Sequence, residues 1–142
     1  MNDAEKQIKH LEFIQNIVTR MNGNSFQIKS WTITIVSAIF AIYATNPNSY
    51  FILVSAFPVI MFWFLDAYYL QQERKFRGLY NDVAGVSEDP QTIKPFAMRP
   101  DLYVGAKHGF FNVFFSSTVM GLYASLGGII IVIFVILKCF GK

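Results

Sequence analysis

Hydrophobic positions gather into three long stretches along the 142-residue chain, with polar segments before and between them. The first stretch covers 26–45 and contains Lys29, and the second covers 50–70 and contains Asp66. The third covers 110–137 and has no charged residue. A helix of about 20 residues spans the roughly 30 Å hydrocarbon core of a bilayer. The pattern therefore predicts an all-α membrane protein with three transmembrane helices.

The third stretch is longer than one span requires, at about 28 residues against about 20. Its first turns could lie in the membrane interface, the helix could be tilted, or Gly127 and Gly128 could break it. We favour an interfacial start near GFFNVFF, residues 109–115.

The first two stretches are separated by the short sequence NPNS at 46–49. Asn and Pro end the first helix, and Asn48 or Ser49 can cap the next one. These two helices are therefore predicted to form a tight antiparallel hairpin.

The segment before the first stretch, 1–24, is predicted to be an amphipathic helix, because its apolar residues recur at steps of three and four. These residues are Ile8, Leu11, Ile14, Val18 and Met21. Asn22-Gly23 is typical of a turn, after which Asn24 or Ser25 would cap the first membrane helix. Two placements stay open. The helix packs on the membrane surface or the rest of the fold, or it packs on neighbouring subunits.

Helical periodicity continues beyond the second stretch to about residue 84. Residues 85–100 are rich in Gly, Pro and acidic side chains, which favours a loop. Pro100 or Asp101 can start a short helix before the third span. The chain is thus divided into an N-terminal helix (1–24), a transmembrane hairpin (25–70), a cytosolic helix and loop (71–109), and a third transmembrane helix with a short tail (110–142).

Composition agrees with this assignment and excludes several functions. The chain is 54% hydrophobic and 15% charged, whereas soluble domains carry about 25% charged residues. A net charge of +3 is too small to indicate nucleic-acid binding. The first residues lack the apolar core and cleavage site of a signal peptide, so the mature chain is expected to begin near Met1.

The sequence contains no catalytic or cofactor motif. Cys139 is its single cysteine, so no intrachain disulfide can form. His10 and His108 have no cysteine or carboxylate cluster at metal-ligand spacing. Neither a nucleophile motif nor a glycine-rich phosphate loop occurs. The chain is therefore expected not to be an enzyme and to bind no cofactor or metal.

The distribution of Lys and Arg predicts the orientation in the membrane. Ten of the 12 Lys and Arg residues fall before or within the start of the first stretch, or between the second and third. The short connection at 46–49 has none, and the C-terminus has two. Cytoplasmic segments carry the excess of positive charge. We expect a membrane protein whose N-terminus is cytoplasmic and whose C-terminus lies on the opposite side. If the third stretch is re-entrant, only the C-terminal assignment changes.

Asp66 is the charged residue that most needs an explanation, because an ionised side chain at bilayer depth costs about 2.5–3.5 kcal/mol or more. Lys29 lies 18 residues before Pro47, and Asp66 lies 18 residues after Asn48. Antiparallel helices rise at the same rate, so both residues reach the same depth. We predict that they form an ion pair within or between subunits. There are two alternatives. The Asp66 side chain extends to the membrane interface without a partner, or it takes part in conducting ions or protons.

Small residues form a stripe on each of two apolar helices. The first stripe consists of Ser30, Thr34, Ser37, Ala41 and Ala44. The second consists of Ser117, Gly121, Ser125 and Gly128. Small residues let membrane helices approach closely, and hydroxyls can bond across the contact. The stripes indicate either packing within one chain or assembly into a ring, with the first stripe near its axis as a candidate pore face.

Positive charge also clusters just after the second stretch, at Arg74, Lys75 and Arg77. The ordinary reading is the positive-inside bias with contacts to anionic lipid headgroups. The alternative is a bound anionic ligand, such as a signalling nucleotide.

Two stretches carry a family resemblance: HLEFIQNIVTRMNGNSFQIKSW and FPVIMFWFLDAYYLQQERKFRGLY. An Arg followed four residues later by NSF and then by a membrane hairpin is similar to the small bacterial membrane proteins of the SLATT and RipA-like group. The matching positions are Arg20, Asn24, Ser25 and Phe26. The resemblance covers about 80 residues and excludes the middle loop and the third stretch.

The resemblance implies a two-helix membrane core with helical cytosolic flanks that assembles into a homo-oligomer, octameric in the RipA-like case. It also implies a bacterial inner-membrane location, in which the C-terminus would be periplasmic. For SLATT-like proteins it implies an effector of anti-phage defence that perforates or depolarises the membrane when a partner senses infection, often through a nucleotide. This chain has a third stretch and no recognisable sensor domain, so a cytosolic partner would supply sensing. Arg20 and the Arg74–Arg77 helix would form the coupling surface. The alternative function is a non-conducting scaffold that anchors a cytosolic partner.

Overall fold

The computed structural model describes residues 2–105 and 107–140, and within them every regular element is a helix. The all-α prediction is thereby confirmed for this part of the chain. The elements are α1 (Asp3–Thr45), α2 (Ser49–Ala84), the 3₁₀-helix η1 (Pro100–Leu102), α3 (Phe110–Phe114) and α4 (Ser117–Phe140).

The first helix, α1, is continuous over 43 residues, so the predicted turn at Asn22-Gly23 is wrong. A glycine in a helix interior costs about 1 kcal/mol relative to alanine, and the buried positions on both sides of Gly23 outweigh this cost. The true N-terminal cap is Asn2. Its side chain accepts from the backbone of Glu5, whose carboxylate accepts from the backbone of Asn2 in return.

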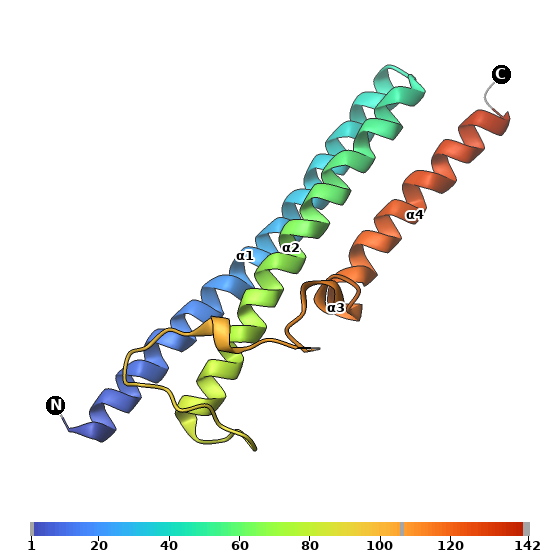
Figure 1. Cartoon of the computed structure of the whole chain (residues 1–142). Helices are drawn as coiled ribbons and strands as arrows, with labels where there is room; N and C mark the ends of the chain where they lie inside the picture. Colours follow the sequence, from blue (N-terminus) through green and yellow to red (C-terminus); the bar gives the residue numbers. More distant parts are fainter. Residues whose placement is uncertain (1, 106, 141–142) are drawn as a thin grey trace.

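Helices α1 and α2 run antiparallel and lie side by side (Figure 1). The side chain of Asn48 caps α2 by accepting a 3.0 Å hydrogen bond from Tyr50 N–H. The helix passes through Pro58 without ending and stops at Ala84, where Gly85 takes a left-handed conformation with φ of 72°. The predicted extension to about residue 84 is thus confirmed, and 86–99 contains no helix.

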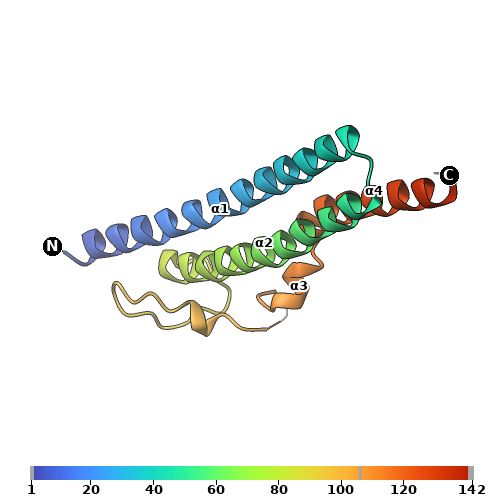
Figure 2. The same cartoon turned by 90° about the horizontal axis from the view of Figure 1, so that it is seen from above.

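The third apolar stretch is divided between two helices. The break lies at Phe115 and Ser116, between α3 and α4, and α4 continues through Gly127 and Gly128. Of the three explanations for its length, a break at the glycines is therefore wrong. Helix α4 packs mainly against the part of α2 that begins at Ser49 (Figures 1 and 2).

Three helices, α1, α2 and α4, are long and apolar enough to cross a membrane. At 1.5 Å per residue, α1 is about 65 Å long and α2 about 54 Å, against about 36 Å for α4. The first two therefore exceed a hydrocarbon core of about 30 Å by a wide margin.

Buried side chains form two separate clusters. The apolar core joins α1, α2 and α4 and consists of Val36, Ile52, Val59, Ala67, Val119, Tyr123 and Ile130. The loop core lies at the opposite end of the helix pair and consists of Ile14, Val18, Leu79 and Tyr103. The N-terminal half of α1 thus packs on the rest of the fold, although Ile8, a member of its predicted stripe, is 57% exposed.

Tyr103 fastens the segment between α2 and α3 to α2. Its hydroxyl donates to the carboxylate of Asp82, which also accepts from Ser87 Oγ and from the Gln91 backbone N–H. The ring of Tyr103 lies directly over Gly78, where a Cβ atom would come within 2.6 Å of Tyr103 Cδ1. Gly78 is therefore required by the docking of this segment.

Replacement of Gly78 by Ala is expected to lower the free energy of unfolding by about 1–3 kcal/mol, because the added methyl group displaces the Tyr103 ring. Gly23→Ala is the matched control. Nothing lies within 4 Å of its Cβ position, so it should raise stability by about 0.5–1 kcal/mol through helix propensity. Denaturant titration in detergent micelles, followed by circular dichroism, measures both. Equal stabilisation by the two substitutions would contradict the close contact.

Candidate functional site

Asp66 and Lys29 are in contact inside the structure. Lys29 Nζ lies 2.6 Å from Asp66 Oδ2 and 2.8 Å from Oδ1, so the ammonium group bridges both carboxylate oxygens. The Asp66 side chain is fully buried, and the Lys29 side chain is 24% exposed. Because burial of an unpaired charge is costly, Lys29 is the reason that Asp66 can occupy this position in the ionised state.

Ser25 completes this polar site. Its hydroxyl donates to Asp66 Oδ1 and accepts from Lys29 Nζ at 2.7 Å. Ser25 therefore does not cap a helix, as the predicted turn required, but lies inside α1 and bonds across to α2. The spacing of four residues between Ser25 and Lys29 places both on one helix face, and this signal could have identified the serine as a third member.

Two further polar side chains lie beside the site and were not predicted. Thr32 and Tyr123 are fully buried, and the Tyr123 hydroxyl faces Thr32 and Asp66 without a hydrogen bond of ordinary geometry. Thr32 donates to the backbone carbonyl of Ile28 at 2.8 Å. Since Tyr123 belongs to α4, the third helix also reaches the carboxylate. A tyrosine in an apolar stretch gives no sequence signal for such a role.

Aromatic side chains join α2 to α3 about one turn from Asp66. Trp63 stacks on Phe114 of α3 with ring centroids 4.5 Å apart, and its Nε1–H donates to the Phe114 carbonyl at 3.1 Å. Phe64 also packs against Phe114, at 4.8 Å, and Phe110 lies beside it. Helix α3 is thereby held at the level of the ion pair.

The first small-residue stripe lies on the outside of α1, opposite its buried face. Ser30, Thr34, Ser37, Ala41 and Ala44 are all exposed, so packing of this stripe within one chain is wrong. Ser30 and Thr34 donate their hydroxyls to the carbonyls of Phe26 and Ser30, one turn earlier. The face thus carries polar hydroxyl groups, and those of Ser30 and Thr34 are hydrogen-bonded within α1.

The second stripe is also uncovered. Ser117, Gly121, Ser125 and Gly128 are exposed on α4. A Cβ atom at either glycine would meet nothing within 4 Å, and Ser125 donates to the Gly121 carbonyl at 2.6 Å. Both stripes are therefore open to a neighbour outside the protomer.

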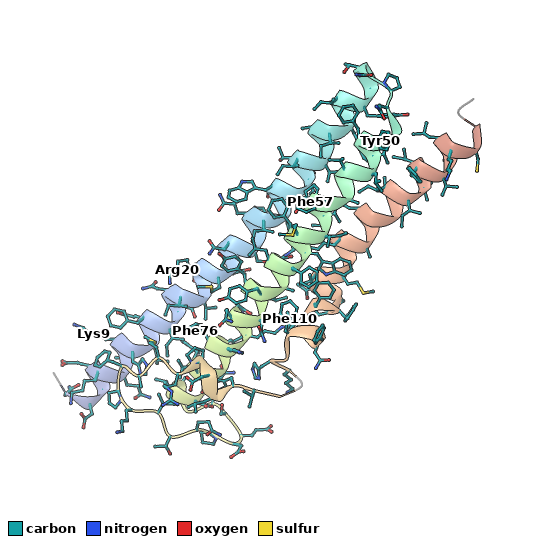
Figure 3. The ribbon with its side chains drawn as sticks, turned by 45° about the horizontal axis from the view of Figure 1, so that its top comes forward. Lys9, Arg20, Tyr50, Phe57, Phe76 and Phe110 are labelled. Carbon is teal, nitrogen blue, oxygen red and sulfur yellow. The ribbon has the colours of Figure 1, made fainter. Side chains whose placement is uncertain are left out.

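The predicted cationic surface is not gathered into one site. Arg77 is paired along α2 with the buried carboxylate of Glu73. The pKa of Asp101 is lowered chiefly by Arg99 and to a smaller extent by Lys75. Among the described residues, Arg20 and Arg74 form no hydrogen bond or ion pair. Figure 3 labels Arg20 and Lys9 along the N-terminal half of α1, away from the end that carries Tyr50 and Phe57.

No group of three or more His, Cys, Asp or Glu side chains suited to a metal ion occurs in the part of the chain that the structure describes. His10 accepts from Phe96 N–H, and the His108 ring lies 5.9 Å from the ring of Tyr103, so both histidines lie beside the loop core. The chain matches no protein-family model, no curated protein and no solved structure. The SLATT and RipA-like resemblance therefore stays a hypothesis, and function must be argued from the geometry.

Lys29→Met is expected to lower the free energy of unfolding by about 3–5 kcal/mol, because it leaves the Asp66 carboxylate buried without its counter-charge. The double variant Lys29→Met, Asp66→Leu should recover most of this loss, since both charges are then absent. Unfolding in mixed micelles measures the resulting double-mutant cycle.

Lys9→Met, which removes an exposed lysine from the same helix, is the control for loss of positive charge and should be near neutral. A double variant no more stable than Lys29→Met alone would show that the pair does not balance the burial cost.

Proposed function

We propose that this chain is a three-span inner-membrane protein that assembles into a homo-oligomeric ring and acts as a gated, membrane-depolarising pore. In each protomer the spans would be the α1–α2 hairpin from the ion pair to the connection at 46–48, and α4. The remaining halves of α1 and α2 would project into the cytoplasm with 86–103 docked on them.

The ion pair marks the proposed cytoplasmic edge of the hydrocarbon. Sixteen residues separate Lys29 from Thr45, which corresponds to about 24 Å of helix. This distance is close to the thickness of a hydrocarbon core of about 30 Å. Trp63 lies one turn from Asp66 and stacks on Phe114 of α3. Aromatic residues are enriched at membrane interfaces, so their position agrees with an edge of the hydrocarbon at this level. The excess of Lys and Arg on this side supports a cytoplasmic assignment.

The exposed Ser30–Thr34–Ser37 face is the observation that carries the proposal. Along the same helix Ile28, Thr32 and Val36 are buried against α2, so the hydroxyl face points away from the protomer. In a lone protomer this polar face would meet lipid. In a ring it would meet other copies or an aqueous axis. A lining of hydroxyls without a charged ring would conduct with weak selectivity.

The stripe on α4 offers a second contact between protomers. Gly121 and Gly128 leave space on an exposed apolar helix, which is the surface that lets membrane helices approach closely. The α4 face would then pack against a neighbouring copy, while the hydroxyl face of α1 is turned toward the axis. A head-to-tail contact of this kind forms a ring when its rotation closes.

Continuity of α1 supports gating from the cytoplasmic side. Because the helix has no joint at Asn22-Gly23, movement of its N-terminal half is transmitted to Ser30 and Thr34. Arg20 and Arg74, which hold no ion pair among the described residues, are available to a cytosolic sensor or an anionic signal. A role in anti-phage defence rests on the SLATT-like resemblance.

Membrane potential in bacteria that express the chain, with its genomic neighbours, during phage infection tests the pore. We expect depolarisation on infection that is lost in Thr34→Leu and Ser37→Leu, because leucine makes the axis apolar. Thr34→Ser retains the hydroxyl and should depolarise like the parent chain. So should Ile35→Leu, an exposed position beside the face. A steady potential with protection intact would overturn the pore and favour the non-conducting scaffold.

A further inference from the structure

His10 connects α1 to the segment between α2 and η1. Its side chain is 2% exposed, and Nδ1 accepts a 3.3 Å hydrogen bond from the backbone N–H of Phe96. The bond joins residues 86 positions apart. His10 lies one turn from Ile14 of the loop core, against which Ile93 and Met98 of the same segment also pack. The imidazole is thus part of the docking site of this segment.

The hydrogen bond fixes which nitrogen carries the proton. A neutral imidazole has one donor and one acceptor nitrogen. Since Nδ1 accepts from Phe96, the proton of the neutral ring is on Nε2. Nε2 is buried and has no hydrogen-bond partner among the described residues. The docked arrangement therefore suits the neutral ring and gives the charged ring no acceptor of its own.

Phe96 has a backbone conformation that needs support from its surroundings. Its φ is 62°, in the left-handed region that bulky side chains rarely occupy. The His10 hydrogen bond and two ring contacts hold it, with centroids 5.8 Å from His10 and 6.1 Å from Phe13. If these contacts weaken, the residue gains by returning to negative φ, and the segment around it must then change course.

We propose that His10 is a proton-operated latch for residues 86–99, which dock when the imidazole is neutral and detach when it is protonated. A proton on Nδ1 turns the acceptor into a donor that faces the Phe96 N–H. The same proton places a positive charge in a buried position. Both effects act against docking, and relief of the Phe96 conformation acts in the same direction. Histidine side chains gain this proton between about pH 8 and pH 5.

The charged groups that face His10 come from α1 and α2. A cavity of about 240 Å³ beside it is lined by Asp3 and Lys6 of α1, which pair at 2.8 Å, and by Asp82 of α2. From the loop it is lined by uncharged residues, Gln91, Ile93 and Pro95. Burial tends to raise the pKa of Asp82, but hydrogen bonds from Ser87, Tyr103 and Gln91 outweigh it and lower the pKa below 3.8. Asp82 therefore stays ionised between about pH 8 and pH 5.

Hydrogen exchange on the full chain in detergent micelles tests the latch, at about pH 7.5 and about pH 5.5, with labelling times scaled to the intrinsic exchange rate. We expect amides of 86–99 to be protected at the higher pH and to lose protection at the lower pH. Amides of 28–36, within the continuous helix α1, should stay protected at both.

His10→Asn is the informative variant, because its side-chain oxygen can accept from Phe96 N–H and does not titrate. It should keep 86–99 protected at both pH values. The His108 ring lies 5.9 Å from that of Tyr103 in the loop core, so His108→Gln tests the second histidine near this segment, and it should still lose protection of 86–99 at the lower pH. Exposure of 86–99 at low pH in His10→Asn, as in the parent chain, would overturn the latch. So would protection of the parent chain at both pH values.

Nitrogen NMR of ¹⁵N-histidine in the His108→Gln chain supplies a test that needs no change at His10. The ring should carry its proton on Nε2 at the higher pH, and it should titrate with the same midpoint as the loss of protection in 86–99. A different midpoint, or a proton on Nδ1 at high pH, would contradict the proposal. These readouts do not depend on conduction, so the latch and the pore can fail separately.

Discussion

The buried carboxylate of Asp66 is the constraint on which the arrangement of the helices depends. It needs a cation and a hydrogen-bond donor, and α1 supplies both from one face, through Lys29 and Ser25. A shift of α1 by one residue would turn both groups away from α2 and leave the charge unpaired. The ion pair therefore fixes the register of two helices that otherwise meet mainly through apolar contacts, which tolerate many alignments. Near the N-terminus of α1, Gln7 adds a hydrogen bond to the Val83 carbonyl of α2 at 2.8 Å.

This register explains how one helix pair carries two cores. On one side of the polar site the apolar core joins α1 and α2 to α4. On the other side the loop core joins them to the segment that contains Tyr103. Continuous helices link the two, so the polar site separates a part that suits lipid from a part that suits water. Tyr123 extends the link to α4, because its hydroxyl faces the same carboxylate.

Much of this fold follows from local and periodic features of the sequence. Length and apolarity indicate the three long helices, and equal spacing from the connection brings Lys29 and Asp66 to one level. The turn at Asn22-Gly23 was predicted wrongly because turn propensity is local. Burial of Val18, Ser25 and Ile28 on one face favours a straight helix instead. The break at Phe115 and Ser116 could not be predicted, because neither glycine nor proline occurs there. It follows from the stacking of Phe114 on Trp63, a contact between residues 51 positions apart.

The exposed small-residue faces of α1 and α4 are explained by the central position of α2 between these two helices. Helix α2 contacts both α1 and α4 and buries residues along its length, including Ile52, Ser55, Val59 and Asp66. Each outer helix buries one side only, so the small-residue faces of α1 and α4 remain on the surface. Within a membrane there is no hydrophobic drive to cover them, and association must come from close packing and hydroxyl contacts. Small side chains on both outer helices supply these features, and this supports the proposed assembly with further copies of the chain.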